Sequence, residues 1–387
     1  MGSVVIVSTF RTPVGMLSGN LKSKTAIELG SSVIAEITKN CRNIDGLYLG
    51  CALSAGLGQS PARQVAIGAG LNESVNSVNV NKVCGSGMMA VMIARNALLV
   101  GESKIAIAGG IESMTNAPYL LKNARLGYRF GNGIIIDHIT EDGIYDAYEK
   151  CPMGAYAEDT ATALSISRDE QDKYAIESIN KARKATEKGV FQNEITPIIV
   201  TNKKEKIAVN QDEKPFSVDL AKIPNLKPAF KENGTITAAS SSSISDGAAA
   251  MLMMKESTAQ KMGLHPLARI VAQASFSQSP KLFATAPIMA IKQVLEKSKW
   301  SLGEVDIFEI NEAFAVVAIA AIKTLSIDPE KVNILGGACA IGHPIGASGA
   351  RIITTLLNAM KITQSKRGLA SLCVGGGEGV AMTFELL

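Results

Sequence analysis

A cysteine in a glycine-rich turn is the first residue whose surroundings suggest chemistry. Cys84 lies in the run NKVCGSG at 81–87, after a short apolar stretch and before an apolar helical pattern. The first turn of a helix carries about half a positive charge, which favours a thiolate over a thiol. The neighbouring glycines let backbone N–H groups approach a substrate carbonyl closely. A buried structural cysteine is the alternative, but this placement favours a nucleophile.

The second candidate is a histidine near the end of the chain. The sequence has three histidines, His138, His265 and His343, and only His343 stands between a glycine and a proline, in the run GGACAIGHPIG at 336–346. Imidazole titrates near neutral pH, so it can accept a thiol proton or donate a proton to an enolate oxygen. We therefore expect His343 to act in acid–base catalysis, and His138 and His265 to have ordinary surface roles.

Two weaker candidates also lie where strands are expected to end. Cys373 precedes the run VGGGEG at 374–379, where a strand rather than a helix should follow. A dinucleotide or phosphate cradle is therefore disfavoured, and a second thiol beside open backbone N–H groups suits proton transfer. Asn311 begins the run NEAFA at 311–315. It is either a helix N-cap or an amide that holds a water as an oxyanion donor.

Composition restricts the class of protein. The chain has 387 residues, of which 47% are hydrophobic and 19% charged, so it can bury substantial cores. Only 5% are aromatic and the net charge is +4. These values disfavour a nucleic-acid surface, which needs basic stripes and stacking platforms. They are compatible with an acidic small-molecule substrate.

The six cysteines indicate a reducing environment. They include no Cys-x-x-Cys pair and no metal-type spacing with histidine, which predicts free thiols and no metal site; they are Cys41, Cys51, Cys84, Cys151, Cys339 and Cys373. No basic leader precedes the strand-like run at 4–7, and the last residues match no retention signal. No apolar stretch was expected to reach membrane-spanning length. We expect a cytoplasmic protein with neither a membrane nor a nucleic-acid partner.

The first and last thirds of the chain show the same alternation of strands and helices. In the first third, strands are expected at 4–8, 46–50, 75–80 and 104–108, with helices at 25–38, from 61 and at 87–100. In the last third, strands are expected at 268–274, 305–310, 332–335 and 369–373, with helices at 287–297, 312–324 and 347–360. Such alternation predicts parallel sheet. In each third the third strand leads through a small-residue turn (84–87, 346–349) into a long helix, which indicates a duplicated α/β unit.

The stretch between these thirds, at 113–243, differs in character. It begins with a polar, glycine-rich loop at 125–143, and Ser167 with Glu170 forms a capping-box pattern before a helix at 169–188. Loops as long as the first of these are usually functional or oligomeric.

Together, and in this order, the four motifs around Cys84, Asn311, His343 and Cys373 resemble those of the thiolase family, in particular its acetoacetyl-CoA-forming branch. The resemblance spans nearly the whole chain, from the run RTP at 11–13 to the glycine-rich end. It implies a duplicated α/β thiolase fold of five layers, αβαβα, with an inserted α+β loop domain. The halves would be 1–112, completed by 244–267, and 268–387, with coenzyme A and oligomer contacts at 113–243. It also implies a dimer, and the segment 120–143 resembles one that joins two dimers into a homotetramer.

The resemblance assigns a role to each motif in condensing two acetyl-CoA molecules to acetoacetyl-CoA and CoA. Cys84 would carry the acetyl group, His343 would activate it, and Cys373 would remove the α-proton of the second acetyl-CoA. Asn311, through water, and His343 would form one oxyanion hole, and the N–H groups of Cys84 and Gly375 the other. Ser242 and Phe230 match positions that contact coenzyme A. No permanent cofactor is expected, and coenzyme A and acetyl-CoA would be substrates.

Two alternatives remain at this point, and two related enzymes are disfavoured. A degradative thiolase acting on longer 3-ketoacyl-CoA is compatible with Pro152, where acetoacetyl-forming members often have histidine. A non-catalytic lipid carrier of the same fold would not need Cys84, His343 and Cys373 together. Decarboxylating ketosynthases use one cysteine with two histidines, and hydroxymethylglutaryl-CoA synthases use cysteine, histidine and glutamate, so Cys373 disfavours both. Asp159, Cys339 and Glu378 are further departures from the family pattern.

Overall fold

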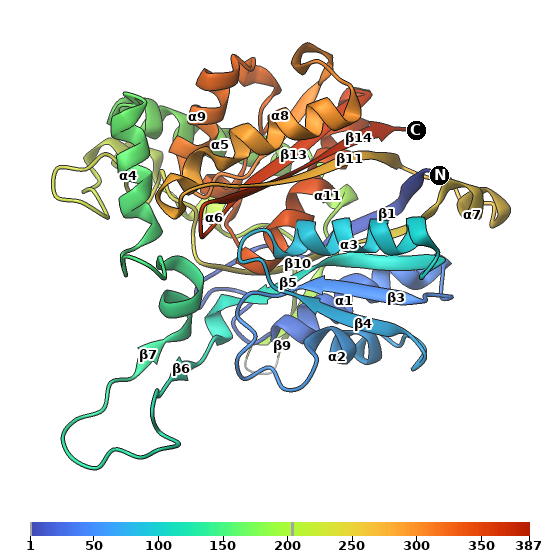
Figure 1. The fold of residues 1–387 in the computed structure, drawn as a ribbon, viewed down its shortest axis with the longest axis horizontal. Coiled ribbons are helices and arrows are strands. Elements are labelled where there is room, and N and C mark those ends of the chain that lie inside the picture. The colour runs from blue at the N-terminus through green and yellow to red at the C-terminus, as the bar shows by residue number, and fades with distance from the viewer. Residues whose placement is uncertain (1, 203–204) are drawn as a thin grey trace.

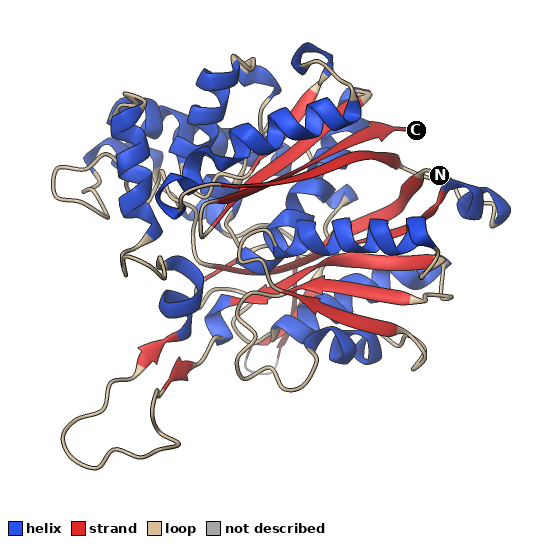
Figure 2. Cartoon of the chain, in the orientation of Figure 1, coloured by secondary structure: helices blue, strands red, loops and turns tan. Residues whose placement is uncertain are grey.

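The computed structural model describes residues 2–202 and 205–387, and its main body has five layers (Figure 1). Two groups of strands lie one above the other. Helices α3 and α11 fill the space between them, α8 covers the outer face of the upper group, and α1 and α2 cover the outer face of the lower group (Figure 2). The five-layered αβαβα arrangement expected from the sequence is therefore confirmed.

The lower group of strands comes from the first part of the chain, with one later strand inserted. The spatial order is β1-β10-β5-β3-β4. β3 is parallel to β4 and β5, whereas β10 is antiparallel to both β1 and β5. The strands are β1 (Val4–Arg11), β3 (Gly46–Gly50), β4 (Asn76–Val80), β5 (Ile105–Ser113) and β10 (Ser245–Lys255), with the short β2 (Gly15–Met16) beside β10.

The upper group repeats this plan with four strands from the end of the chain. Its order is β12-β13-β14-β11, in which β12 and β13 are parallel and the other neighbours antiparallel. These strands are β11 (Ala268–Ser277), β12 (Ile307–Ile310), β13 (Arg367–Val374) and β14 (Glu378–Leu386). The two groups join where β1 meets β11, through the pairs Val4 with Ile270, Val5 with Arg269 and Ile6 with Ala268.

The expectation of a parallel sheet is only partly correct. Parallel pairing occurs at the outer strands of each group, and the inner strands next to the β1–β11 junction are antiparallel. β10 is buried along almost its whole length, and residues 248–254 within it are all apolar. Such a run looks alike in parallel and antiparallel sheets when both faces are covered. The sequence pattern therefore could not distinguish the two.

The outer helices each bury one apolar stripe. In α1 (Ala26–Ile37), Thr25 and Glu28 form a capping box at the start, and Leu29, Val33 and Ile37 lie on the buried face at helical spacing. This helix packs on β10 and β5 and against α2 (Pro61–Gly68). On the opposite side of the molecule α8 (Ala286–Ser298) packs on β14 and β11, with α9 (Ala315–Leu325) beside it.

The two middle helices are in backbone contact at their first turns. α3 (Ser86–Val100) and α11 (Ile345–Thr363) pack against each other and together fill one apolar core between the two groups of strands. A Cβ added at Gly87 would lie 2.9 Å from the backbone nitrogen of Ala350, and one at Gly349 only 2.4 Å from that of Met88. Glycine is therefore required at both positions by the approach of the helices, and this approach brings the residues that precede them together.

The inserted region packs at one end of the layers. Its longest helix, α5 (Arg168–Glu187), starts with the capping box of Ser167 and Glu170 that the sequence predicts. A protruding loop runs between β6 (Tyr119–Leu120) and β7 (Ile136–Asp137) and extends away from the body (Figure 1). The other elements here are α4 (Met153–Ala163), β8 (Ile198–Asn202), β9 (Glu205–Val209) and α6 (Lys214–Ser217), with α7 (Glu256–Lys261) and α10 (Ala338–Ile341) later in the chain.

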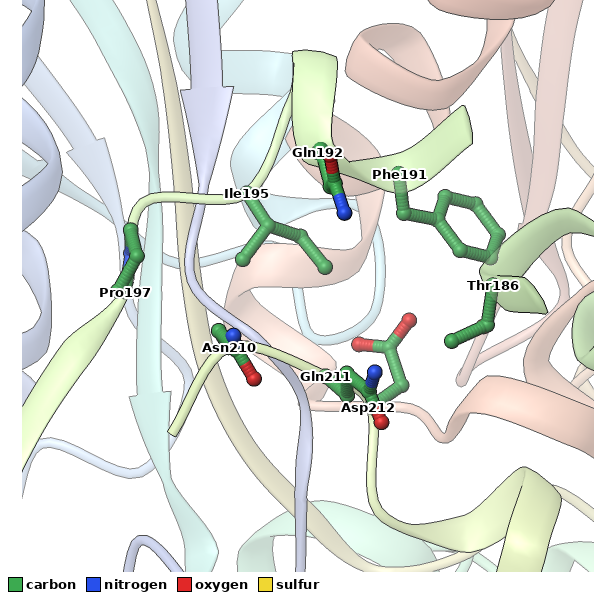
Figure 3. A pocket seen from close by; sticks show the side chains of 8 residues that line it. All are labelled: Thr186, Phe191, Gln192, Ile195, Pro197, Asn210, Gln211 and Asp212. Carbon is green, nitrogen blue, oxygen red and sulfur yellow. The ribbon is translucent and has the colours of Figure 1, made fainter. Parts of the chain in front are cut away.

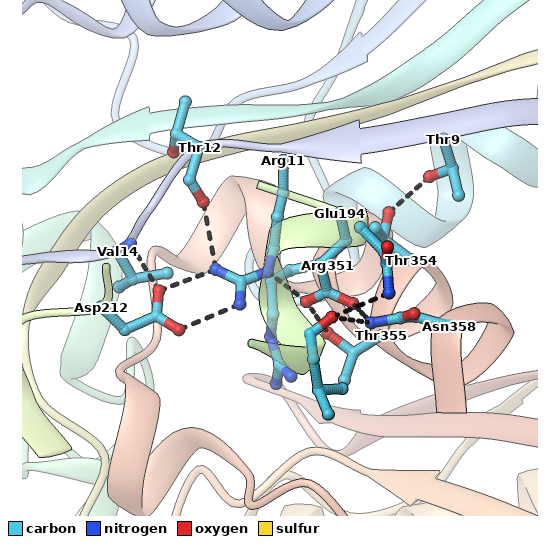
Figure 4. Close-up of polar contacts among 12 residues, drawn as sticks. Thr9, Arg11, Thr12, Val14, Glu194, Asp212, Arg351, Thr354, Thr355 and Asn358 are labelled. Carbon is cyan, nitrogen blue, oxygen red and sulfur yellow. Dashed lines mark hydrogen bonds and ion pairs between the residues drawn. The ribbon is translucent and has the colours of Figure 1, made fainter. Parts of the chain in front are cut away.

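A buried ion cluster ties this region to the layers (Figure 4). The guanidinium of Arg11, at the end of β1, donates two hydrogen bonds to Asp212 at 2.7 and 2.9 Å and one to Glu194 at 2.6 Å. Glu194 in turn accepts hydrogen bonds from Thr355 and Asn358 on α11. Because all the partners are buried, losing one would leave a charge unpaired in an apolar environment, which is strongly destabilising.

Two expected elements in the last third differ from the structure. The strand expected at 332–335 is absent from the described residues there, and Val332 makes only an isolated bridge to Phe308. The turn expected at 346–349 is instead the first turn of α11, which begins at Ile345. A run of four residues of which three are apolar does not distinguish a short strand from a buried connection, and the repeat of the first third is therefore imperfect.

The expectation that no apolar stretch reaches membrane-spanning length is wrong. The 18 residues Val83–Val100 have a mean hydropathy of 1.6. In the structure this stretch is α3 with the turn before it, in the middle layer, and 56% of it is buried inside the protein. Its composition follows from contact with the lower group of strands on one side and with α11 on another.

The contact between α3 and α11 predicts the effect of a single methyl group. We expect Gly349→Ala to lower the free energy of unfolding by about 3 kcal/mol, at the upper end for overpacked cores, because the clash is with backbone. Urea denaturation followed by circular dichroism measures this. Gly303→Ala is the matched control, since a Cβ there would meet no atom within 4 Å. Equal stability of the two variants would contradict the proposed constraint.

Candidate active site

One cavity of about 300 Å³ gathers most of the residues that the sequence singles out. Cys84, His343, Cys373, Gly375, Ser242 and Phe230 all line it. They come from the turn before α3, the turn before α11, the end of β13 and the inserted region. Asn311 is the exception, since it is buried next to this site but is not part of the cavity wall.

The turn that carries Cys84 is held in a strained conformation. Val83 has a φ of +47°, which is unfavourable for a β-branched residue and costs about 1–3 kcal/mol. Three hydrogen bonds maintain it: Val83 N–H donates to the Asn81 side chain at 3.0 Å, Lys82 N–H donates to Ser86 Oγ at 2.8 Å, and Ser86 Oγ donates to the Val83 carbonyl at 2.7 Å. Such strain concentrates at functional sites.

The thiol of Cys84 is protonated in the resting site. Burial raises its pKa to about 11, although the backbone N–H groups of Gly375 and of Cys84 itself are directed at the sulfur and lower the pKa. The expectation that the start of α3 would favour a thiolate is therefore wrong, because desolvation outweighs the helix dipole. Cys84 needs a base to become a nucleophile.

His343 has the protonation state of such a base. Burial, followed by the charge of Arg351, lowers the pKa of His343 to about 3, so its ring is neutral near pH 7. Its Nδ1 is hydrogen-bonded to Ser348 Oγ, and Ser348 Oγ donates its own hydrogen to the Pro344 carbonyl at 2.9 Å. Nδ1 must therefore be the donor to Ser348. This leaves Nε2, which has no partner among the described residues, as the proton acceptor.

Cys373 is a second thiol, which is buried at the end of β13, whereas Cys84 is partly exposed. It is 1% exposed, and its pKa lies well above the ordinary value because of burial and of the neighbouring Cys84. The glycine run that follows forms the tight connection to β14, in which Gly376 and Gly377 have φ values of +89° and +86°. This connection presents the Gly375 N–H group toward Cys84.

Asn311 is not the N-cap of a helix. The next helix, α9, begins at Ala315 after Phe314, and both polar atoms of the Asn311 side chain lack a hydrogen-bond partner among the described residues. A buried amide without a partner is unusual, because it loses its hydrogen bonds to water. The alternative role, as a donor toward the cavity through water, therefore stays a prediction and gains support.

Comparison with known proteins identifies the family of the chain. The family model for the thiolase N-terminal domain matches residues 4–257, and that for the thiolase C-terminal domain matches residues 264–386. The chain belongs to the thiolase family. An acetyl-CoA acetyltransferase of Cupriavidus necator is 44% identical over the full length of both chains, and the mitochondrial acetyl-CoA acetyltransferase of Rattus norvegicus is 44% identical over 100% of this chain and 92% of its own.

Solved structures of thiolases agree closely with this fold. An acetyl-CoA acetyltransferase of Bacillus anthracis superposes with a TM-score of 0.98 at 38% identity, covering 100% of this chain and 99% of its own. A thiolase of Ascaris suum, solved in complex with coenzyme A, gives 0.94 at 39% identity over 100% of both chains.

The cavity wall of this thiolase includes apolar residues that the sequence did not reveal. They lie far apart in the sequence and share only their position in space; they are Ile144, Met153, Ile244, Phe283, Phe314 and Ile345. Phe314 packs edge-to-face against both Phe230 and Phe283. No spacing in the sequence could link residues so far apart. Pro152, which the sequence flagged as a departure, also lines this wall.

Two buried glutamates were also missed. Glu112 accepts hydrogen bonds from the N–H groups of Ala52, Leu53 and Gly346 and thereby fixes the start of α11, and burial raises its pKa to about 7. Glu312 accepts hydrogen bonds from Asn333 and from the N–H of Cys339, which fixes the loop before His343. The run NEAFA contained Glu312, but nothing in the sequence showed what it contacts.

Two other residues have surroundings that the sequence did not predict. His138 was expected at the surface but is 5% exposed, with its Nδ1 2.6 Å from Asp142. Cys339 is fully buried beside Glu312, and burial raises its pKa well above the ordinary value, so inert packing is the interpretation that fits.

A second cavity, of about 250 Å³, lies between the end of α5 and the segment at 210–212 (Figure 3). Phe191, Gln192 and Asp212 line it, and Asp212 is already hydrogen-bonded to Arg11. It contains none of the candidate catalytic residues.

The protonation states at Cys84 and His343 predict how this thiolase reacts with an alkylating agent. Because the thiol has a pKa near 11 and the imidazole is neutral, the thiolate fraction should rise about tenfold per pH unit from pH 7 to 10. The rate of iodoacetamide addition to Cys84, followed by mass spectrometry, should rise in proportion. Cys84→Ser is the blank. A rate that levels off near pH 7 would instead indicate a thiolate–imidazolium pair.

Proposed function

We propose that this thiolase condenses two acetyl-CoA molecules to acetoacetyl-CoA and CoA, reversibly, through an acetyl group carried on Cys84. The observation that supports this best is the meeting of two thiols and a neutral imidazole in one largely apolar cavity. The acetyl-CoA acetyltransferase names of relatives 44% identical over the whole chain support the same substrate.

In the first step, Cys84 takes the acetyl group. His343 Nε2 accepts the thiol proton while the sulfur attacks the carbonyl carbon of acetyl-CoA. In this proposal the developing oxyanion is stabilised by the N–H groups of Cys84 and Gly375, which point toward the sulfur of Cys84 in the resting site. Such a donor is typically worth about 10²–10³ in rate. The carbonyl re-forms and the C–S bond to CoA breaks. The departing CoA thiolate takes the proton of Cys373 and leaves as a thiol, so Cys373 becomes a thiolate while the proton from Cys84 stays on His343 Nε2.

In the second step, a second acetyl-CoA becomes the nucleophile. Cys373, as a thiolate, removes a proton from its methyl group, and the enolate oxygen is stabilised by His343 and by Asn311 through water. The enolate carbon attacks the acetyl group on Cys84, a C–C bond forms, and the C–S bond to Cys84 breaks. The Cys84 thiolate takes its proton back from His343, while Cys373 keeps the proton from the methyl group. General base catalysis of this kind contributes about 10²–10⁴ in rate. A second thiol is needed because Cys84 is occupied.

Coenzyme A and acetyl-CoA are the substrates in this proposal, and the chain needs no resident cofactor. Ser242 and Phe230 are placed on the cavity wall, where they can contact the pantetheine arm of CoA. The Ser242 hydroxyl already donates to the Ala313 carbonyl at 2.9 Å. The thiolase of Ascaris suum was solved with coenzyme A.

A second candidate function is cleavage of longer 3-ketoacyl-CoA. Pro152 lines the cavity, together with apolar side chains that include Met153 and Phe283. An apolar wall at this point would tolerate a longer acyl chain better than an imidazole would.

The two candidates differ in the substrate that is cleaved fastest. We expect thiolysis of acetoacetyl-CoA by CoA to exceed thiolysis of a 3-keto C8 thioester by at least about tenfold in kcat/KM, roughly the discrimination that a few methylene groups provide. Loss of each thioester is followed spectrophotometrically. A preference for the C8 substrate would favour the degradative function.

Two variants check the assignment of the thiols. Cys84→Ser should abolish turnover of both substrates, and Cys373→Ser should stop condensation while leaving acetylation of Cys84 by acetyl-CoA detectable by mass. Turnover that survives in Cys84→Ser would contradict the proposed enzyme and favour a carrier.

We also propose that the protein is a homotetramer, joined through the protruding loop between β6 and β7. Four large apolar side chains in this loop are 67–102% exposed in the single chain; they are Leu126, Phe130, Ile134 and Ile135. Exposed apolar groups of this density indicate a protein contact.

Removing two of these side chains should halve the assembly. We expect the variant Leu126→Ser with Phe130→Ser to elute with the mass of a dimer, and the unaltered protein with that of a tetramer, in size-exclusion chromatography with light scattering. A dimeric unaltered protein would exclude this role for the loop.

A further inference from the structure

Two turns from different halves of the chain meet at the Cys84 oxyanion hole. The first, at 81–86, carries Cys84, and the second, at 374–378, carries Gly375. Their side chains and backbones are close: a Cβ at Gly85 would lie 2.8 Å from Val374, and one at Gly375 would lie 3.7 Å from Val83. The spacing of the two N–H groups therefore depends on how these turns are held together.

An ion pair joins the same two turns. The Nζ of Lys82, two residues before Cys84, donates to the carboxylate of Glu378, three residues after Gly375. Their side chains are only 21% and 32% exposed. Burial lowers the pKa of Lys82. Glu378 is also the residue at which β14 begins, paired with Val374 and Ser277.

The backbone hydrogen bond of the second turn does not fix its position relative to the first turn. Gly377 accepts a hydrogen bond from the Gln278 N–H at 2.9 Å, which ties the turn to the segment after β11. That bond is on the C-terminal half and does not reach the turn at 81–86. Two polar contacts cross between the turns: the Gly375 N–H points toward the Cys84 sulfur, and the side chain of Lys82 pairs with that of Glu378.

We propose that the Lys82–Glu378 ion pair is a positioning device for catalysis, which holds the Gly375 N–H group at the distance from Cys84 that the oxyanion requires. The proposal rests on the acyl transfer at Cys84 proposed above. Neither residue touches the reacting atoms, and both act through the position of Gly375. The glutamate that appeared in the sequence only as an extra charge in the glycine run thereby gains a function.

The physical reason lies in the steep dependence of catalysis on distance. An oxyanion donor works because it is already in place when the charge develops, and a displacement of about 1 Å can cost about 10² in rate. The two N–H groups belong to turns that are far apart along the chain, since residues 85–374 lie between them. A partly buried ion pair between the turns restricts the movement of one turn relative to the other. It adds little to the overall stability of the protein.

The test uses Glu378→Gln, Lys82→Met and the exchanged pair Lys82→Glu with Glu378→Lys in the full-length protein. We expect each single variant to lower kcat for acetoacetyl-CoA thiolysis about tenfold, less than the loss of a whole donor, because the donor is displaced rather than removed. KM for CoA should stay within about twofold, since substrate contacts are unchanged. The exchanged pair should recover most of the rate. The melting temperature should not change.

A second readout does not depend on turnover. A hydrogen bond to the charged form of a thiol favours that form, so weaker contact from Gly375 should slow alkylation of Cys84 by iodoacetamide at pH 9. We expect a decrease of about threefold in the single variants and recovery in the exchanged pair. If the unaltered protein has no Cys84-dependent turnover, the proposed function fails, and this readout still decides whether the ion pair positions Gly375.

Glu385→Gln is the matched control. It removes a glutamate from the other end of β14 that pairs with Arg269 at 2.6 Å and is similarly exposed, at 36%. Both readouts should be unchanged in this variant. Single variants of Lys82 and Glu378 that match the unaltered protein in kcat and alkylation would overturn the proposal. So would a raised KM for CoA at constant kcat, which would make Lys82 a substrate contact.

Discussion

The close approach of α3 and α11 is the constraint on which the rest of the structure depends. Each helix follows a turn that carries a candidate catalytic residue, Cys84 before α3 and His343 before α11. Because the helices touch through Gly87 and Gly349, those two turns open into the same cavity. The strands above and below, the capping carboxylate of Glu112 and the ion cluster of Arg11 all serve to keep this contact in register.

Burial determines the protonation states of the residues that line this cavity. In water a thiol and an imidazole have similar proton affinities, but in this cavity both are held neutral, with the pKa of Cys84 raised and that of His343 lowered. Neutral partners cost little to desolvate. Charge then develops only during the reaction, where N–H groups are directed at it, and this difference between ground state and transition state is what accelerates a reaction.

The sequence predicted those parts of the site in which the residue type and its immediate neighbours already indicate a chemical role. Cys84, His343 and Cys373 stand in glycine-rich turns, and the family resemblance gave the five layers and the candidate roles. Long periodic helices such as α1 and α5 were also predicted to within a few residues. The antiparallel inner strands, the absent strand at 332–335 and the raised pKa of Cys84 were not predicted, because they depend on which surfaces become covered. The apolar wall with Phe283 and Phe314, and the partner of Glu378, depend on contacts between distant segments.

The junction of β1 with β11 has a consequence for the origin of such a chain. The two strands pair there through only three residue pairs, and the main contact of the two halves is the apolar core around α3 and α11. A single half would expose that apolar face to water. If one unit was duplicated, two copies of the ancestor had to cover each other before they were joined, so the ancestor was an obligate dimer. Its catalytic cavity, built from both halves, would then have been an interface between subunits.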